Sequence, residues 1–395
     1  MKEGWTYKKL GEICDYSIGL TYKPTDVCDN GTIVLRSSNI QNEQIDLNDI
    51  VRVSCPIKDS LFVNKGDILM CSRNGSARLV GKVAIIPDIK ERMTYGTFMM
   101  IIRSEYNPFL FYYFKSDVFR KQIKHGEANM INQITRYMLD DVVVSLPPLS
   151  DQQRIVSRLD AAFSHIDELK ANAEKQLSEA HTLFQKSLAK AMEPKEGWKE
   201  KKMKEISNKI GSGATPRGGK KVYINNGTSL VRSMNVYNNE FKYTDLAYIN
   251  EDAANQLNGV ELKKDDVLFN ITGASIARCC IVPEDVLPGR VNQHVAIVRP
   301  RKDLVLSKFL CLCLLSARHQ KELLEIGVAG STRQAITKAD LEDHIVFLPP
   351  LSEQQRIVER LDALSAHVRE LEENQKKIIS ECDALKQALL RKVFE

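Results

Sequence analysis

The stretch LPPLSDQQRIVSRLDA at residues 146–161 returns as LPPLSEQQRIVERLDA at residues 348–363. The copies are identical at fourteen of sixteen positions and begin 202 residues apart. In each copy two prolines, which cannot continue a helix, precede a serine with a glutamine three residues later, the spacing of a helix-capping box. The sequence therefore predicts that a long helix begins at each copy, with Ser150 and Ser352 as the N-caps.

After each predicted helix start, a stripe of mostly apolar residues recurs at alternating steps of four and three, the spacing of a coiled coil. We call this stripe the seam. The first predicted seam comprises Ile155, Leu159, Ala162, Ile166, Leu169, Ala173, Gln176, Ala180 and Leu183. The second comprises Ile357, Leu361, Leu364, Val368, Leu371, Gln375, Ile378, Cys382, Leu385 and Leu389. A narrow stripe on a long helix needs a second long helix to cover it, so we expect the two copies to pair antiparallel, about a pseudo-twofold axis, with one globule at each end.

The repeat begins before the helices. KEGWTYKKLGEI at residues 2–13 matches KEGWKEKKMKEI at residues 195–206 at eight of twelve positions. Trp5 and Trp198 hold equivalent places in these segments, and we predict that both are buried anchors at a domain entrance. The predicted organisation is a globule at 1–145, a helical region at 146–193, a second globule at 194–347 and a second helical region at 348–395.

Within the globules the strands match and the loops do not. Residues 95–103 align with residues 291–299 as one strand, and short apolar runs bounded by Gly, Asn and Pro indicate a twisted sheet. The loops at 17–25 and 211–221 have little in common. The predicted fold class is α+β, with two mixed α/β globules alternating with two long helices. Because loops carry recognition and cores carry packing, we expect two globules that do one task on different targets.

The composition is that of a globular protein, with 43% hydrophobic and 27% charged residues. No apolar run is long enough to span a bilayer, so we expect a cytoplasmic protein with no membrane partner. Nine cysteines without a CxxC pair and seven histidines without an HxxxH-type pair predict reduced thiols and no metal site. The net charge of +5 is mild; residues 1–145 carry 19 basic and 17 acidic side chains and residues 193–347 carry 23 and 19. That surplus fits globules that touch an anionic polymer.

Tests for catalytic motifs are negative. GSGATPRGGK at residues 211–220 resembles a phosphate-binding loop, but Ala214 and the absence of Ser or Thr after Lys220 break the required spacing. Glu261-Leu262-Lys263 has the E-x-K shape of some nuclease sites without a paired Asp in a convincing context. Motifs of serine hydrolases, zinc proteases and zinc deaminases are missing. We therefore expect a protein that is not an enzyme and has no catalytic residue.

LPPLS[DE]QQRIV leading into a long heptad helix, twice, each time after a variable globule, resembles the specificity subunit of type I restriction-modification systems. The resemblance covers essentially the whole chain. It implies that the globules are target recognition domains for double-stranded DNA and that the helices are conserved regions. It also implies two modification subunits, which methylate adenine N6 with S-adenosylmethionine, and restriction subunits, which use ATP and magnesium. No cofactor is then expected in this chain itself.

We expect base contacts from polar side chains in the unmatched loops and phosphate contacts from Lys and Arg. The first globule's candidates are Arg36, Arg73, Asn74, Ser76, Arg136 and Tyr137. The second globule's candidates are Arg217, Lys220, Arg232, Thr272, Ser275, Arg290, Asn292, Gln293 and Arg333. Arg36 and Arg232 recur at aligned positions, which favours phosphate or core-edge roles over base reading. Each candidate has the alternative of being an ordinary surface residue.

Polar residues outside the predicted seams also repeat almost unchanged. They are Gln152, Gln153, Arg154 and Arg158 in the first helix and Gln354, Gln355, Arg356 and Arg360 in the second. Helix capping accounts for Gln153 and Gln355. We expect the others to form two equivalent docking faces for two identical partner subunits; the alternative is a solvated face left by duplication. A further alternative for the whole chain is a coiled-coil protein scaffold that does not read DNA, which would bind nucleic acid with little dependence on salt.

Overall fold

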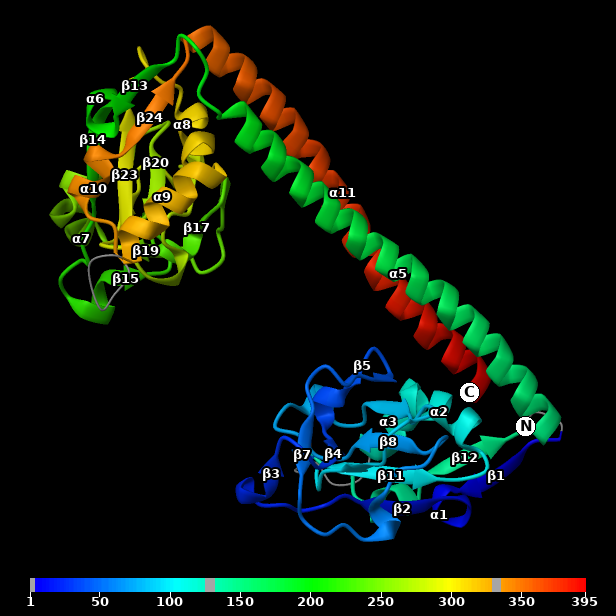
Figure 1. Ribbon diagram of the computed structural model, residues 1–395. Coiled ribbons are helices and arrows are strands. Elements are labelled where there is room, and N and C mark those ends of the chain that lie inside the picture. The colour runs from blue at the N-terminus through cyan, green and yellow to red at the C-terminus, as the bar shows by residue number, and fades with distance from the viewer. Residues whose placement is uncertain (1–3, 125–131, 329–334) are drawn as a thin grey trace. The chain divides into compact units, whose positions relative to one another are not determined.

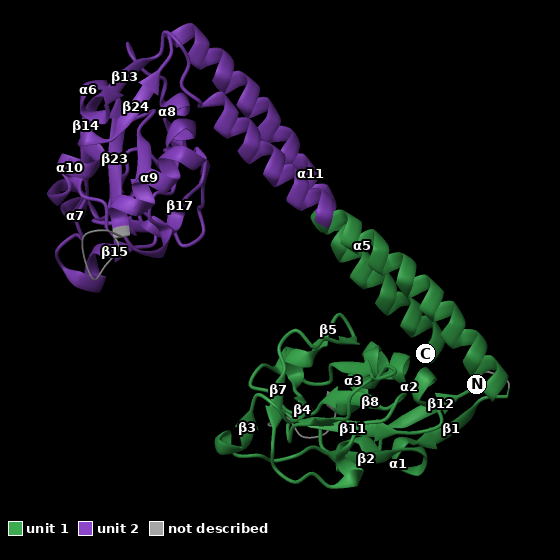
Figure 2. Ribbon diagram, viewed as in Figure 1, with its two compact units in different colours: residues 1–174, 376–395 green, residues 175–375 purple. Residues whose placement is uncertain are grey.

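A computed structural model describes residues 4–124, 132–328 and 335–395. The chain forms two compact units (Figure 2). Unit 1 comprises residues 1–174 and 376–395, and unit 2 comprises residues 175–375. Each unit therefore contains one globule and a part of both long helices. The domain boundaries predicted from the sequence separate helices from globules instead, and they stay a prediction.

The globule of unit 1 contains two four-stranded sheets (Figure 1). The first has the order β2 (Asp15–Ile18), β11 (Met99–Arg103), β8 (Ile68–Cys71), β9 (Val83–Ile85). The second has the order β10 (Met93–Tyr95), β4 (Thr32–Leu35), β7 (Val51–Val53), β3 (Val27–Cys28). Two-stranded ribbons pair β1 (Thr6–Lys9) with β12 (Val143–Leu146) and β5 (Ile40–Gln41) with β6 (Gln44–Ile45). The helices are α1 (Leu10–Ile13), α2 (Asn107–Lys115), α3 (Asp117–Lys124) and α4 (Arg136–Asp140).

The globule of unit 2 repeats this topology strand for strand. Its sheets have the orders β14 (Ser207–Ser212), β23 (Val295–Pro300), β20 (Val267–Asn270), β21 (Cys279–Ile281), and β15 (Tyr223–Ile224), β19 (Ala247–Ile249), β16 (Thr228–Val231), β22 (Arg290–Val291). The ribbons are β13 (Lys199–Lys202) with β24 (Ile345–Leu348) and β17 (Val236–Tyr237) with β18 (Glu240–Phe241). The helices are α6 (Met203–Ile206), α7 (Glu251–Gln256), α8 (Ser307–Leu314), α9 (Ala317–Val328) and α10 (Lys338–Asp343). The predicted α+β class and the internal repeat are confirmed.

One predicted strand is two strands in each globule. Residues 95–103 were expected to be continuous, but β10 ends at Tyr95 and β11 begins at Met99, in a different sheet. The chain leaves one sheet through the turn Gly96–Phe98 and enters the other. Unit 2 does the same through residues 292–294, between β22 and β23. We call these two segments the sheet-crossing turns.

The tryptophans anchor the globules as predicted. Trp5 packs edge-on against Phe109 of α2, with ring centroids 6.4 Å apart, and Trp198 packs against Phe309 of α8 at 6.2 Å. Both indoles are half-buried against the main cores. A second feature shared by the two units is an ion pair with a buried aspartate. It links the neighbouring strands β11 and β8 in unit 1, and β23 and β20 in unit 2. Arg299 of β23 donates to the Asp266 carboxylate at 2.7 Å, and unit 1 has the same pair in Arg103 and Asp67.

Helices α5 (Leu149–Ala191) and α11 (Leu351–Phe394) pair antiparallel within each unit, which confirms the predicted coiled coil. Four polar contacts show the direction, because the residue number rises on one helix as it falls on the other. They are Asp167–Lys386 at 2.6 Å and Lys170–Asp383 at 2.8 Å in unit 1, and Gln176–Gln375 at 3.0 Å and His181–Glu372 at 3.1 Å in unit 2.

The predicted seams are right at every seventh residue and only partly right between these positions. The shared positions are buried: Leu159, Ile166, Ala173 and Ala180 in α5, and Leu361, Val368, Gln375 and Cys382 in α11. Between them, six residues are more buried than the predicted residues one place earlier: Phe163, Lys170, Leu177, Phe184, Ile379 and Lys386. The predicted Leu364 and Leu371 are half-buried, and the predicted Gln176 bonds Gln375 across the pair. Leu169 and Leu183, predicted for the seam, are 57% and 56% exposed. The observed phase is possible because the stems of Lys170 and Lys386 cover apolar surface while their ammonium groups reach carboxylates on the partner helix.

The helix starts also differ from the prediction. α5 begins at Leu149 and α11 at Leu351, so Ser150 and Ser352 lie in the first turn and are not N-caps. Each entry is closed by a different side chain. Gln152 is buried and donates to the carbonyl of Pro147 at 2.8 Å, and Gln354 repeats this contact with Pro349 at 3.0 Å.

A buried histidine pair distinguishes the two cores. His319 Nδ1 lies 2.9 Å from His344 Nε2, and both rings are buried. Phe119 and Val142 hold the equivalent places in unit 1. Glu322 is also near, but two nitrogens on one tetrahedral zinc ion stand about 3.3 Å apart, so this spacing fits a direct hydrogen bond better. Burial lowers the pKa of His319 to about 4 and lowers the pKa of His344 in the same direction.

We predict that unit 2 loses stability as the pH falls from 7 to 5. Unfolded histidines take up protons near pH 6.5, whereas the folded pair stays neutral, so acid favours the unfolded state. His319 alone accounts for roughly 2 kcal/mol over this range. Replacing the pair with its unit 1 counterparts, His319→Phe with His344→Val, should remove most of this slope. Urea denaturation at several pH values measures it, and equal slopes in both proteins would contradict the assignment.

Candidate nucleic-acid interface

In each unit the sheet-crossing turn accepts a backbone hydrogen bond from the loop that follows β8 or β20. The carbonyl oxygen of Phe98 accepts from the backbone nitrogens of Ser72 and Arg73, at 3.0 and 3.1 Å. In unit 2 the carbonyl oxygen of His294 accepts from Ile271 at 3.0 Å. The loop is therefore fastened to the turn through main-chain atoms in both units, and in unit 1 the buried Ser72 hydroxyl adds a bond to the same oxygen at 3.0 Å.

A glycine brings a third loop onto each turn. A Cβ added to Gly19 would overlap the carbonyl oxygen of Tyr95, and one added to Gly213 would overlap that of Val291. Only glycine permits this approach. The loops 17–25 and 211–221, which look unrelated in sequence, thus share one structural residue. In each unit the three loops meet at the same place.

In unit 1 this place gathers some of the predicted residues. Arg73 is exposed and its guanidinium carbon lies 5.8 Å from the centroid of the Phe98 ring. Asn74 donates to Ser37 Oγ at 3.1 Å and accepts from the backbone of Ser76 at 2.9 Å, so its amide holds the loop and is not free to read a base.

Two other predicted residues of unit 1 come shortly after Gln133, which forms an isolated β-bridge with Arg73. Arg136 and Tyr137 open α4 and are both exposed, Tyr137 by 82%. Arg136 lies 3.8 Å from Asp140, one turn further along α4. Arg36 donates to the Asp49 carboxylate at 2.9 Å, which gives it an internal partner.

Unit 2 has a hollow of about 420 Å³ beside the sheet-crossing turn. Thr272 and Ser275, both predicted, line it together with seven other residues. Among these are Met234, Tyr237, Arg278 and His294, which the sequence prediction missed. The Arg278 guanidinium stacks on the Tyr237 ring at 4.8 Å. A signal for His294 is present in the sequence, since it aligns with Phe98 in a stretch where the two halves differ.

A line of hydrogen bonds joins the three loops of unit 2. Thr215 Oγ1 donates to Gln293 Oε1 at 2.5 Å, and Gln293 Nε2 lies 3.1 Å from His294 Nε2. His294 Nδ1 in turn lies 2.6 Å from Thr272 Oγ1. The predicted Gln293 is therefore exposed but committed to its neighbours, and it bridges the loop 211–221 to His294.

Three predicted residues of unit 2 are placed for internal roles. Arg290 is 6% exposed and donates to the carbonyl oxygens of Ala254 and Gly289 and to Asn258 Oδ1, each within 3.1 Å. Asn292 is buried and accepts from the backbone of His294 at 3.1 Å, which shapes the turn. Arg232 donates to the carbonyl oxygen of Asp245.

Two further candidates of unit 2, Arg217 and Lys220, do not line the hollow. Both are exposed on the glycine-containing loop 211–221. Arg333 lies outside the described residues.

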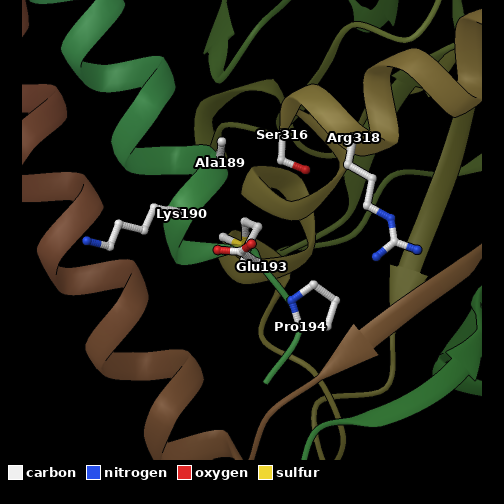
Figure 3. Close-up of a pocket in the computed structure, with 7 residues that line it drawn as sticks. Ala189, Lys190, Glu193, Pro194, Ser316 and Arg318 are labelled. Atoms are coloured by element: carbon white, nitrogen blue, oxygen red, sulfur yellow. The ribbon is translucent and has the colours of Figure 1, made fainter. Parts of the chain in front are cut away.

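A second hollow of unit 2, of about 530 Å³, lies where α5 ends (Figure 3). Ala189 and Lys190 approach it from α5, Glu193 from the segment just after α5, and Ser316 and Arg318 from the junction of α8 and α9. The Ser316 hydroxyl donates to the carbonyl of Cys313 at 2.8 Å, so it is engaged in ending α8. This hollow contains none of the predicted DNA-contacting residues.

The predicted docking residues divide into buried and exposed sets. Gln152 and Gln354 are buried at the helix entries, so they cannot form part of an exposed face. The exposed set comprises Gln153, Arg154, Arg158, Gln355, Arg356 and Arg360. Arg154 pairs with Asp151 at 3.0 Å, and Gln355 donates to Glu359 at 2.8 Å, so these two act within their own helix. The capping role expected for Gln153 and Gln355 is not what closes the helix entries.

Two globules with one backbone frame and different loop side chains, each attached to a shared pair of antiparallel helices, define a duplicated recognition protein. The chain belongs to the family described as Type I restriction modification DNA specificity domain, which it matches over residues 2–179 and 195–381. It is a type I specificity subunit, as the repeated motif indicated.

The relatives agree in length and in fold. The chain is 24% identical to the type I restriction enzyme EcoKI specificity subunit of Escherichia coli K12, covering all of this chain and 89% of that one. It is 25% identical to the putative MjaX specificity subunit of Methanocaldococcus jannaschii, over 92% and 87% of the two chains. A chain from a solved type I R-M system has a TM-score of 0.76 at 21% identity over 100% and 98%. The HsdS subunit of Thermoanaerobacter tengcongensis has a TM-score of 0.55 at 22% identity over 100% and 97%. Within the described residues, none of the helices could cross a membrane.

We predict that Arg290→Ala destabilises unit 2 by about 2–4 kcal/mol, because it leaves buried acceptors such as Asn258 Oδ1 without a donor. The matched control Arg217→Ala removes an exposed arginine and should change the free energy of unfolding by less than about 0.5 kcal/mol. Urea denaturation measures both. Equal stability of the two variants would show that Arg290 is not a structural residue.

Proposed function

We propose that this specificity subunit reads a bipartite, asymmetric DNA site, one half with each globule. The observation that carries the proposal is the pair of sheet-crossing turns, where one shared backbone contact, from Ser72 to Phe98 or from Ile271 to His294, is surrounded by unlike side chains. Two copies of one reader with the same side chains would read a symmetric site. Arg73 with Phe98 in one unit and Thr272 with His294 in the other favour different bases.

The paired helices are proposed to set the unread gap between the half-sites. Their antiparallel contacts run through both units, so a change in paired length moves one reader relative to the other by about 1.5 Å per residue. The alternative, a protein-binding scaffold without DNA readout, gives no reason for the polar loops to meet at one place in each globule.

The chain itself is proposed to make no covalent change to DNA. Methylation of adenine would be carried out by two modification subunits that bind S-adenosylmethionine, and cleavage by restriction subunits that use ATP and magnesium. The repeated arginines of α5 and α11 support two equivalent docking faces. Arg158 and Arg360 are the most direct candidates, since both are exposed and lie 202 residues apart, at the same place in the repeat.

Inserting one heptad into each helix, after residue 174 in α5 and after residue 375 in α11, tests the gap. We expect both half-sites to remain and the gap to grow by about three base pairs, because seven residues add about 10.5 Å and base pairs stack about 3.4 Å apart. The measurement is a map of N6-methyladenine in cells that express the variant with its cognate modification subunits.

The control carries the insertion in α5 alone, which breaks the register of contacts such as Gln176 with Gln375. This variant should lose methylation or stability. If the doubly extended chain instead gives altered bases at an unchanged gap, the helices do not set the distance. If the unaltered chain gives no two-part site, the proposed function itself fails.

Docking is tested by charge reversal. Arg158→Glu and Arg360→Glu should each lower the number of bound modification subunits from two to one, and the double variant should bind none, because each arginine serves one face. Native mass spectrometry of the co-expressed complex counts the subunits. Lys186→Glu is the control, since Lys186 is exposed on α5 and its repeat position holds Ala388. Two subunits retained by all variants would exclude these arginines as docking residues.

A further inference from the structure

One pair of positions is the same in both backbones and different in chemistry. Residues 73 and 272 each lie six residues beyond the buried aspartate, Asp67 or Asp266, of the shared ion pair. Each forms an isolated β-bridge, Arg73 with Gln133 just before α4, and Thr272 with Ala335 just before α10. Residues 98 and 294 each come directly before a strand, β11 or β23, which is paired with β8 or β20 in the sheet. We call Arg73 with Phe98, and Thr272 with His294, the turn pairs.

In unit 1 the turn pair presents a flat cation on an exposed ring. Phe98 is 55% exposed, although a phenylalanine next to a strand would ordinarily be buried. Its ring lies 5.8 Å from the Arg73 guanidinium, which limits the directions that this long side chain can take. The neighbouring Asn74 is occupied by Ser37 and Ser76. Arg73 is therefore a group of this loop that can offer two parallel donors, and O6 and N7 of guanine are two adjacent acceptors.

In unit 2 the hydrogen bonds fix both the tautomer and the direction of donation. Thr215 donates to Gln293 Oε1, so the Gln293 amide turns its NH₂ group toward His294 Nε2. That nitrogen must then accept, and the proton of the neutral ring sits on Nδ1, which donates to Thr272 Oγ1. The Thr272 hydroxyl accepts from the ring and is left to donate its own proton into the hollow.

The hollow also contains an apolar contact for the same base. Met234 is 44% exposed and lines the hollow with Thr272. The Thr272 hydroxyl next to an apolar side chain suits thymine, which shows O4 as an acceptor beside its C5-methyl group in the major groove. The Arg278 guanidinium also lines the hollow, where it stacks on the Tyr237 ring. Ser38 holds the aligned place in unit 1, where no methionine is present.

We propose that the turn pairs select the base at one position in each half-site: Arg73 with Phe98 selects guanine, and Thr272 with His294 selects thymine. Gln293 and Thr215 are positioning residues, which act through His294. The proposal rests on the proposed two-part reading and names the residues and bases for it. It assigns the discrimination to side chains of a turn whose backbone is common to both readers.

The test exchanges the pairs one unit at a time. The chain with Arg73→Thr and Phe98→His, expressed with its cognate modification subunits, should show roughly 5- to 150-fold weaker preference for guanine at one position of one half-site. The other half-site should be unchanged. The reciprocal chain, with Thr272→Arg and His294→Phe, should move one position of the other half-site from thymine toward guanine. Mapped N6-methyladenine sites give both results.

Two milder variants keep the test decisive if an exchanged chain folds poorly. Arg73→Lys keeps the charge and removes the paired donors, and Thr272→Val keeps the shape and removes the hydroxyl. Each should relax one base position while total methylation falls little. Arg78→Ala is the control for charge, since it removes another exposed arginine of the same loop region and should weaken methylation evenly at all sites.

The outcomes separate the two claims. If the unaltered chain methylates a two-part site and the exchanged chains keep its bases, the turn pairs do not select bases and the two-part function stands. Uniform weakening by Arg73→Lys, like that of Arg78→Ala, would make Arg73 a phosphate contact and overturn the proposal. A single altered position confined to one half-site supports it.

Discussion

Each globule depends on one backbone constraint, which is the close packing of two loops on the carbonyl oxygens at the sheet-crossing turn. Main-chain donors from the loop after β8 or β20 reach the oxygen of Phe98 or His294. A glycine, Gly19 or Gly213, lets the second loop approach the strand end before the turn. Because none of these contacts uses a variable side chain, the positions around the turn can change without loss of the frame. A reader built this way can acquire a new target by substitutions at a few outward-facing residues.

The two halves of the chain show how far such change has gone. The buried ion pairs, the indole anchors and the buried asparagines before the hairpins are the same, down to Asn39 and Asn235, each of which donates to two carbonyl oxygens. Against this shared frame even the core has diverged, with a histidine pair in place of Phe119 and Val142. The two halves therefore differ in their buried titratable groups as well as in the chemistry of their loops.

Sequence patterns predicted the architecture well because it follows from strong periodic signals: the duplicated helix starts, the heptad spacing and the matched strands. The seam was misplaced at several intervening positions because both phases share every seventh residue, and a lysine whose stem packs and whose ammonium group pairs with a carboxylate is not recognised as a seam residue. The break between β10 and β11 was missed because apolar residues continue on both sides of Gly96–Phe98. Among the candidate readers, composition pointed to loops beside the sheet-crossing turns but could not show that Arg290 and Asn292 turn inward, since burial depends on partners far away in sequence.

Through α11, residues from the end of the chain complete the hydrophobic core of unit 1. Leu390 is fully buried in the core of unit 1, and the Phe394 ring packs 5.1 Å from Phe109 and 5.4 Å from Tyr113. These two α11 residues are translated long after the globule that they complete. During synthesis the first globule must therefore wait, with an apolar face uncovered, until the ribosome has made the second, so its maturation is tied to completion of α11 and a prematurely stopped chain would carry an open core.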